Sequence, residues 1–84
     1  MPALQQVSFC IISLYPNPAR TSVSIHGLEP GAKVTVVDLN GREVVSRLSP
    51  HSSLTLDVSG LPQGAYFVRI AGMRQTAVRK LVVK

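Results

Sequence analysis

The stretch that decides the fold is Leu56-Asp57-Val58-Ser59-Gly60-Leu61-Pro62-Gln63-Gly64-Ala65-Tyr66-Phe67-Val68-Arg69-Ile70. Beyond Gly64 its residues alternate between two faces, one with Tyr66, Val68 and Ile70 and the other with Ala65, Phe67 and Arg69. Both faces are largely apolar as far as Arg69, which is typical of a strand in the middle of a sheet. The stretch therefore predicts a central strand, entered through turns at Ser59-Gly60 and Pro62-Gln63-Gly64.

Turn-forming residues recur at short intervals along the rest of the chain. They stand at Pro16-Asn17-Pro18, Glu29-Pro30-Gly31, Asn40-Gly41, Ser49-Pro50 and Ala71-Gly72. The segments between them have the length of strands, and the apolar residues are mainly Val, Leu and Ile, with only 5% aromatic residues. This spacing predicts a small all-β sandwich of six or seven strands.

The clearest local prediction is a hairpin from Val34–Leu39 to Arg42–Arg47. Asn40-Gly41 supplies the two positive φ angles that a type I′ turn requires. A two-residue loop sets the register of the strands. We therefore expect three facing pairs: Val37 with Val44, Val36 with Val45, and Asp38 with Glu43.

In two further segments apolar and polar residues alternate regularly, whereas in the last segment they do not. Val23 with Ile25, and Leu54 with Leu56, each predict a half-buried strand. In the segment 77–84 neither alternating set is purely apolar, because cations stand at Arg79, Lys80 and Lys84. Either a bulge near Arg79 or an edge strand whose apolar face is completed by a partner explains this, and lysines also commonly protect edge strands.

Length and charge limit the classes of function. A chain of 84 residues forms one domain with a thin core, because it buries only roughly 60 to 65% of its unfolded surface. Its nine basic and four acidic residues give a net charge of +5, and the stretch from Arg69 to Lys84 holds five cations and no acid. This asymmetry is compatible with a docking end, and also with simple solubility.

The residues of catalytic and metal sites are sparse. The lone Cys10 cannot form an intrachain disulfide, and one Cys with two His does not make a closed zinc site. His26 stands at a strand end and His51 in a polar loop, and no nucleophile elbow surrounds any Ser. Since Tyr66 and Phe67 are adjacent, they point to opposite faces and cannot form one stacking platform for nucleic acid. We expect no enzyme, no cofactor or metal, and no nucleic acid partner.

The first fourteen residues resemble neither a signal peptide nor a membrane span. No Lys or Arg precedes the apolar run, which Ser8 and Ser13 interrupt. Val7–Leu14 is a strand candidate, either the first of this domain or the last of an upstream one. We interpret residues 1–14 as a linker, a first strand or an artificially added start, and residues 15–84 as the domain.

Four segments, in order, resemble the C-terminal sorting domain of the type IX (Por) secretion system of Bacteroidetes. They are Leu14-Tyr15-Pro16-Asn17-Pro18-Ala19, Val36-Val37-Asp38-Leu39-Asn40-Gly41-Arg42, the stretch Leu56 to Ile70, and Lys80-Leu81-Val82-Val83-Lys84. The resemblance covers residues 14–84. It implies an immunoglobulin-like antiparallel sandwich of seven strands at the end of a larger exported protein.

The resemblance also implies a function and partners. Such a domain directs its cargo from the periplasm across the outer membrane to the cell surface, using type IX translocon and shuttle components. A sortase-like cysteine protease then removes it by a cut upstream of Tyr15, and many cargos become attached to lipopolysaccharide. The chemistry belongs to that protease, and this chain is its substrate.

By position, the resemblance assigns two sets of residues. The mainly structural family motif falls on Pro16, Asn17, Pro18, Asp38, Gly41, Arg42, Gly64, Tyr66, Val68 and Ile70. The secretion signal falls on Arg79, Lys80, Leu81, Val82, Val83 and Lys84. We expect another protein to recognise this basic tail, by adding a strand to its edge or by an acidic groove. The same edge could also pair with a second copy of the chain.

An alternative from another class is a β-sandwich adhesion or carbohydrate-binding module of a secreted protein. It would place the function in loops rather than in the tail. The aromatic residues Phe9, Tyr15, Tyr66 and Phe67 are few for a sugar platform. An enzyme ranks last, because no site is visible.

Overall fold

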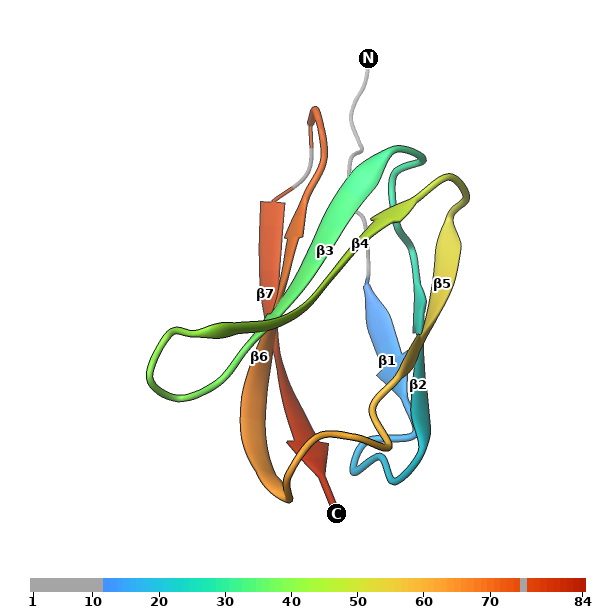
Figure 1. Ribbon diagram of the computed structural model, residues 1–84. Helices are drawn as coiled ribbons and strands as arrows, with labels where there is room; N and C mark the ends of the chain where they lie inside the picture. Colours follow the sequence, from blue (N-terminus) through green and yellow to red (C-terminus); the bar gives the residue numbers. More distant parts are fainter. Residues whose placement is uncertain (1–11, 75) are drawn as a thin grey trace.

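The computed structural model describes residues 12–74 and 76–84, which contain seven strands and no helix (Figure 1). The strands are β1 (Ser13–Tyr15), β2 (Ser22–His26), β3 (Ala32–Val37), β4 (Glu43–Ser49), β5 (Ser53–Asp57), β6 (Gly64–Ala71) and β7 (Thr76–Val83). Within these ranges there is accordingly no helix that could cross a lipid bilayer.

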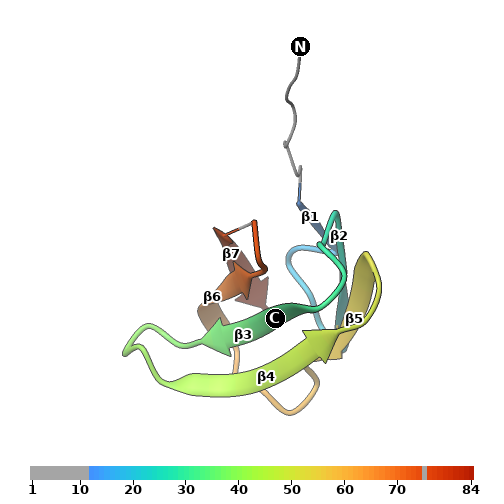
Figure 2. The ribbon, with the colours of Figure 1, turned by 90° about the horizontal axis from the view of Figure 1, so that it is seen from above.

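The strands form two antiparallel sheets. One has the order β1-β2-β5 and the other β4-β3-β6-β7. Seen from above, the two sheets form two layers, with the four-stranded sheet curving past the smaller one (Figure 2). This arrangement of three strands against four confirms the predicted immunoglobulin-like sandwich of about seven strands.

The core lies between the sheets and is built by alternation along the strands. It holds Val23 and Ile25 from β2, Leu56 from β5, Val34 and Val36 from β3, Tyr66, Val68 and Ile70 from β6, and Leu81 and Val83 from β7. The half-buried strands predicted from the Val23 and Leu54 patterns are therefore present. β-Branched side chains dominate the list, which fits a core of packed pleated surfaces.

β6 is a central strand, as its sequence predicts. It lies between β3 and β7, and the side chains of Tyr66, Val68 and Ile70 point into the core. The hydroxyl of Tyr66 donates a hydrogen bond of 2.6 Å to the carbonyl of Pro62. This bond ties the connection between the sheets to the start of β6, an arrangement known as a tyrosine corner in immunoglobulin-like folds.

The β3–β4 hairpin has a different turn from the predicted one. Val36 faces Val45 as expected, but a bulge shifts the register so that Val37 faces Glu43, and neither predicted pair Val37–Val44 nor Asp38–Glu43 forms. Among the described residues φ is positive only at glycines, with Gly41 at 83°, so Asn40 does not take part in a type I′ turn.

The carboxylate of Asp38 explains the turn. Its Oδ1 accepts hydrogen bonds of 2.9 Å from the backbone N–H groups of Asn40 and Arg42, and the Gly41 N–H donates to the Asp38 carbonyl at 3.0 Å. These contacts close a three-residue loop with glycine in the left-handed region, the second common way to connect a hairpin. A local side-chain bond therefore overrides the Asn-Gly preference.

The predicted bulge near Arg79 is absent. β7 pairs with β6 in one continuous register from Thr76 opposite Ala71 to Val83 opposite Gly64. β7 is an edge strand, but its apolar face is completed inside the domain, since Leu81 and Val83 lie in the core. Arg79 shares that face and is exposed, which produces the mixed pattern of the sequence.

The described part of the chain begins with Ile12 and β1, ahead of the loop at Pro16. β1 pairs Ser13 with His26, and Ile12 is buried against the core. The expected boundary between residues 14 and 15 falls inside this strand. The rest of the Val7–Leu14 candidate, including Cys10, lies outside the described residues.

Candidate functional site

The candidate site is the C-terminal segment 79–84, which the sequence singles out as a recognition signal. Its residues 79–83 belong to β7 and pair with β6, and Lys84 follows the strand (Figure 1). Leu81 is 0% and Val83 3% exposed, whereas Arg79, Lys80 and Lys84 are exposed and Val82 is half-buried. Of the six residues, four therefore reach the surface of the folded domain.

The Asn17 side chain binds the outer edge of β7. Its Nδ2 donates to the Lys80 carbonyl at 3.0 Å, and its Oδ1 accepts from the Val82 N–H at 3.0 Å. One amide thus satisfies a backbone acceptor and a backbone donor of the edge strand, in the manner of a neighbouring strand. The flanking peptide bonds Tyr15–Pro16 and Asn17–Pro18 are cis.

Ala19 continues the cover toward the end of the chain. Its N–H donates to the Val82 carbonyl, and its carbonyl accepts from the Lys84 N–H, both at 2.8 Å. Ala19 is fully buried and forms a parallel bridge with Val83. We name the segment 17–19 the edge cover.

The expected recognition of the tail by strand addition is wrong for the folded domain, because the edge cover occupies the outer edge of β7 there. Because the outward backbone groups from the Lys80 carbonyl to the Lys84 N–H bond the edge cover, a partner strand cannot pair there while the edge cover is in place. Within the described chain, the edge of β7 from Thr76 to Arg79 lies outside the edge cover. Pairing with a second copy is restricted to that part and stays a prediction.

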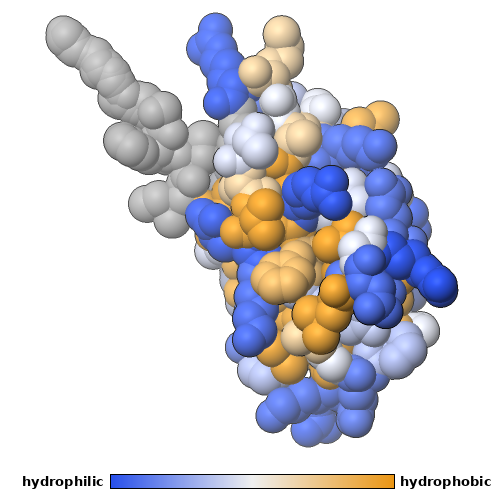
Figure 3. Space-filling model, turned by 90° about the vertical axis from the view of Figure 1, so that its left-hand side faces the viewer, coloured by the Kyte–Doolittle hydropathy of each residue, from blue (hydrophilic) through white to orange (hydrophobic). Residues whose placement is uncertain are grey.

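The outward surface of β6 and β7 carries the exposed side chains of the tail. In Figure 3 apolar side chains gather over these strands, with hydrophilic side chains around them. The described aromatic side chains do not share a platform: Tyr66 is buried, Phe67 lies on this outward surface, and Tyr15 belongs to the other sheet. The Tyr15 ring stacks on His26, and its hydroxyl lies 2.8 Å from His26 Nε2.

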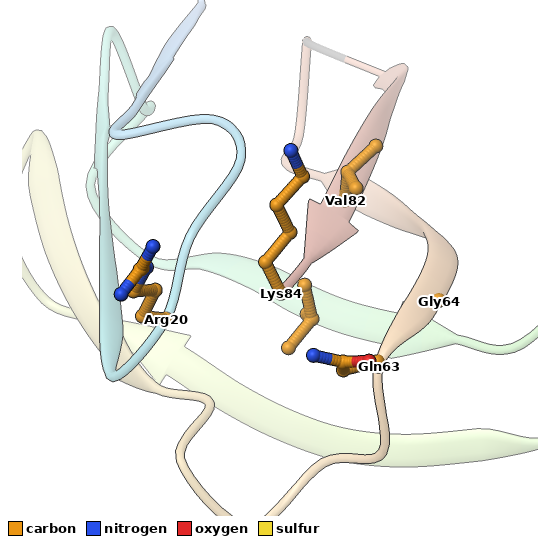
Figure 4. Close-up of a pocket in the computed structure, with 6 residues that line it drawn as sticks. Arg20, Gln63, Gly64, Val82 and Lys84 are labelled. Atoms are coloured by element: carbon orange, nitrogen blue, oxygen red, sulfur yellow. The ribbon is translucent and has the colours of Figure 1, made fainter.

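An open pocket of about 580 Å³ lies beside the end of β7. It is lined by Arg20, Gln63, Gly64, Val82, Val83 and Lys84. The polar ends of Arg20, Gln63 and Lys84 do not converge on one point (Figure 4). No group of three or more His, Cys, Asp or Glu side chains is placed to hold a metal ion within the described part of the chain.

The motif residues away from the tail shape turns and the core. Asp38, Gly41 and Arg42 form the hairpin loop, and Tyr66, Val68 and Ile70 fill the core from β6, which begins at Gly64. Pro16, Asn17 and Pro18 form the loop that reaches β7. The contact of this loop with the tail is not predicted from the sequence, in which the only local signal is one amide side chain between two prolines.

The Asp57 carboxylate, at the end of β5, has a lowered pKa. Hydrogen bonds from the Ser59 hydroxyl at 2.7 Å and from the Ser59 backbone N–H at 2.9 Å lower the pKa of Asp57 below its ordinary value of 3.8. Both donors favour the ionised carboxylate. Asp57 thus organises the turn that follows β5.

Fold and site together define a small immunoglobulin-like domain with a basic, core-anchored C-terminal strand. Residues 13–84 match the family model described as the secretion system C-terminal sorting domain. The chain therefore belongs to the family of type IX secretion C-terminal sorting domains, whose members are parts of secreted proteins.

A solved structure has the same fold. It comes from a structural and functional study of PorZ, which is described as an essential bacterial surface component of the type IX secretion system of Porphyromonas gingivalis. The TM-score is 0.78 at 24% sequence identity, over 87% of this chain and 11% of that chain. This chain thus corresponds to a small part of that protein. No curated protein sequence matches it.

Proposed function

We propose that this chain is the non-catalytic secretion signal of a larger exported protein. It directs an upstream cargo from the periplasm across the outer membrane through the type IX system, where translocon and shuttle components recognise it. The observation that carries the proposal is the family match over residues 13–84.

The exposed side chains of the tail support recognition of a folded surface. Arg79, Lys80 and Lys84 reach solvent while the leucine and valine between them anchor the strand in the core. A partner with an acidic surface would bind these cations and gain orientation from them. The tail then acts as part of a folded domain.

The proposed cleavage by a sortase-like cysteine protease falls upstream of Ile12. Ile12 is buried in the core and Ser13–Tyr15 pair with β2, so a cut at these residues would need part of the sandwich to open. The released cargo would then remain at the cell surface, attached to lipopolysaccharide, or leave for the medium.

The test is a reporter protein placed ahead of residues 1–84 and expressed in a type IX-proficient bacterium. The control is the same strain with its type IX translocon deleted. We expect surface delivery only in the proficient strain, together with a processed reporter whose new C-terminus, by mass spectrometry, precedes Ile12. A reporter that stays in the periplasm of the proficient strain would contradict the proposal.

A further inference from the structure

The outward side chains of β6 and β7 form a continuous two-strand surface. Ala65 is opposite Val82, Phe67 opposite Lys80, and Arg69 opposite Val78. Because all six lie on the side of the sheet away from the core, their side chains share one face. We name these six residues the β6–β7 face.

The β6–β7 face is more apolar than an ordinary solvent-facing sheet. Phe67 is 36% and Val78 53% exposed, and Ala65 and Val82 are half-buried. Figure 3 shows apolar side chains at the centre of this view and hydrophilic ones around them. An apolar centre with a polar border is the arrangement of a protein interaction surface.

The charges on this face are of one sign. Arg69 and Lys80 belong to it, and Lys33 of β3 lies opposite Ala71 beside it. Glu43 shares this side of the sheet but is on β4 opposite Val37, with β3 between it and β6, and Glu29 accepts a hydrogen bond from the Arg74 N–H in the turn between β6 and β7. Asp38 is bound in the hairpin loop, and Asp57 belongs to the other sheet. The face therefore selects carboxylates around its apolar centre.

The burial pattern of the tail points to the same surface. Leu81 and Val83 are in the core, and the backbone edge from Lys80 to Lys84 is bonded to the edge cover. What the folded tail offers on this side of the sheet is Lys80 and Val82, which lie directly beside Phe67 and Ala65. A partner that recognises the tail from this side therefore also contacts β6.

We propose that the β6–β7 face is the docking surface for a partner protein that presents an apolar patch bordered by Asp and Glu side chains. This inference rests on the proposed secretion function and extends its recognition site from the tail to Phe67, Arg69 and Val78. Phe67 is the central anchor, and Arg69 and Lys80 set the orientation of the partner.

The first test replaces the anchor. In the reporter fusion with residues 1–84, Phe67→Ser is compared with Leu48→Ser, which removes a 70% exposed apolar side chain from β4 of the same sheet. Loss of a central anchor costs about tenfold or more in affinity, so we expect Phe67→Ser to lower surface delivery about tenfold. Leu48→Ser delivers like the unchanged chain, and thermal melting of the purified 84-residue variants checks their folding.

The second test reverses charge without touching the apolar centre, and it applies even where Phe67→Ser does not fold. Arg69→Glu with Lys80→Glu is compared with Arg47→Glu plus Arg20→Glu, which change the net charge equally at exposed positions away from this face. We expect delivery to fall about tenfold in the first pair only. The single variant Lys80→Arg, which keeps the charge, is expected to deliver like the unchanged chain.

Three outcomes would overturn the inference. The first is delivery of the β6–β7 face variants at the level of the unchanged chain, and the second is an equal loss in the control variants. The third is binding of the purified chain to phosphatidylglycerol vesicles that Phe67→Ser abolishes, which would assign the face to a lipid surface. If the unchanged fusion itself is not delivered, the proposed function fails, and this is distinguishable from failure of the face variants alone.

Discussion

Single side chains make hydrogen bonds that fix the turns of this domain and, at Asn17, the edge of β7. Asn17 bonds two backbone groups of β7, Tyr66 bonds the carbonyl of Pro62, and Asp57 bonds both donors of Ser59. Each bond satisfies polar groups that the sheets leave without strand partners. At the residue scale, Asn17 and Asp57 each make a separate prediction.

Replacing Asn17 by Ala removes both hydrogen bonds to β7. Because each net hydrogen bond contributes about 1 kcal/mol, we expect Asn17→Ala to lower the free energy of unfolding by about 2 kcal/mol. The measurement is urea unfolding, with amide exchange at Val82 as a local probe, since this N–H loses its acceptor. Asn40→Ala is the matched control, because the hydrogen bond from Asn40 to the Asp38 carboxylate uses the backbone N–H of Asn40, which the substitution keeps. Equal stability of the two variants would contradict the role of Asn17.

Asp57 predicts a pH dependence with a defined sign. Since its pKa is lowered in the folded chain, its contribution to stability is complete above the ordinary value of 3.8 and is lost as the pH falls through the lower native pKa. We expect an NMR titration to show that the native pKa rises in Ser59→Ala, which removes the first donor but keeps the backbone bond. An unchanged pKa in that variant would show that the hydroxyl is not the main cause.

The strands differ in how far their geometry follows from residues that are neighbours in the sequence. β6 follows its alternation directly, because the residues that define its faces are neighbours in sequence. The β3–β4 hairpin does not follow Asn40-Gly41 alone, since the Asp38 carboxylate selects the longer loop. β7 takes the edge position, and its pattern becomes intelligible only beside β6 and the edge cover.

The loop geometry predicts a contrast between two glycines. Gly41 has φ of +83° in open space, so a side chain there costs backbone strain rather than a clash. We expect Gly41→Ala to destabilise the domain by about 1 to 2 kcal/mol, and Gly41→Asn by less, because Asn tolerates the left-handed region. Gly60→Ala serves as the control, since Gly60 has open space and no such φ. Thermal or urea unfolding measures the difference, and equal losses at both positions would refute the assignment.

At the scale of the whole molecule, the segment proposed as the signal is part of the fold. Leu81 and Val83 are core residues, the segment 80–84 binds the edge cover, and Lys80 shares a face with Phe67. A domain of this size has only a small free energy of unfolding. Any change to the tail must therefore be judged first for its effect on the sandwich.

Deletion of residues 80–84 tests whether the sandwich can fold without the tail. Removing one buried Leu alone typically costs about 2 to 5 kcal/mol, and the deletion also removes Val83 and the partners of Asn17 and Ala19. We expect the truncated chain to lose cooperative unfolding in circular dichroism. The triple variant Arg79→Gln, Lys80→Gln, Lys84→Gln keeps a cooperative transition. A folded truncation would show that the tail is a detachable signal.

The sequence by itself determined the strands, the core and the family, because alternation and turn residues act over a few neighbouring positions. Tyr66, Val68 and Ile70, and likewise Val23 and Ile25, occupy the core positions that their spacing predicts. Tertiary structure alone decided that Asn17 meets Lys80 and Val82, 63 and 65 residues away, and that Phe67 and Lys80 share one face. Those contacts depend on which strands become neighbours and which edges close, and packing of whole sheets sets this rather than local backbone preference.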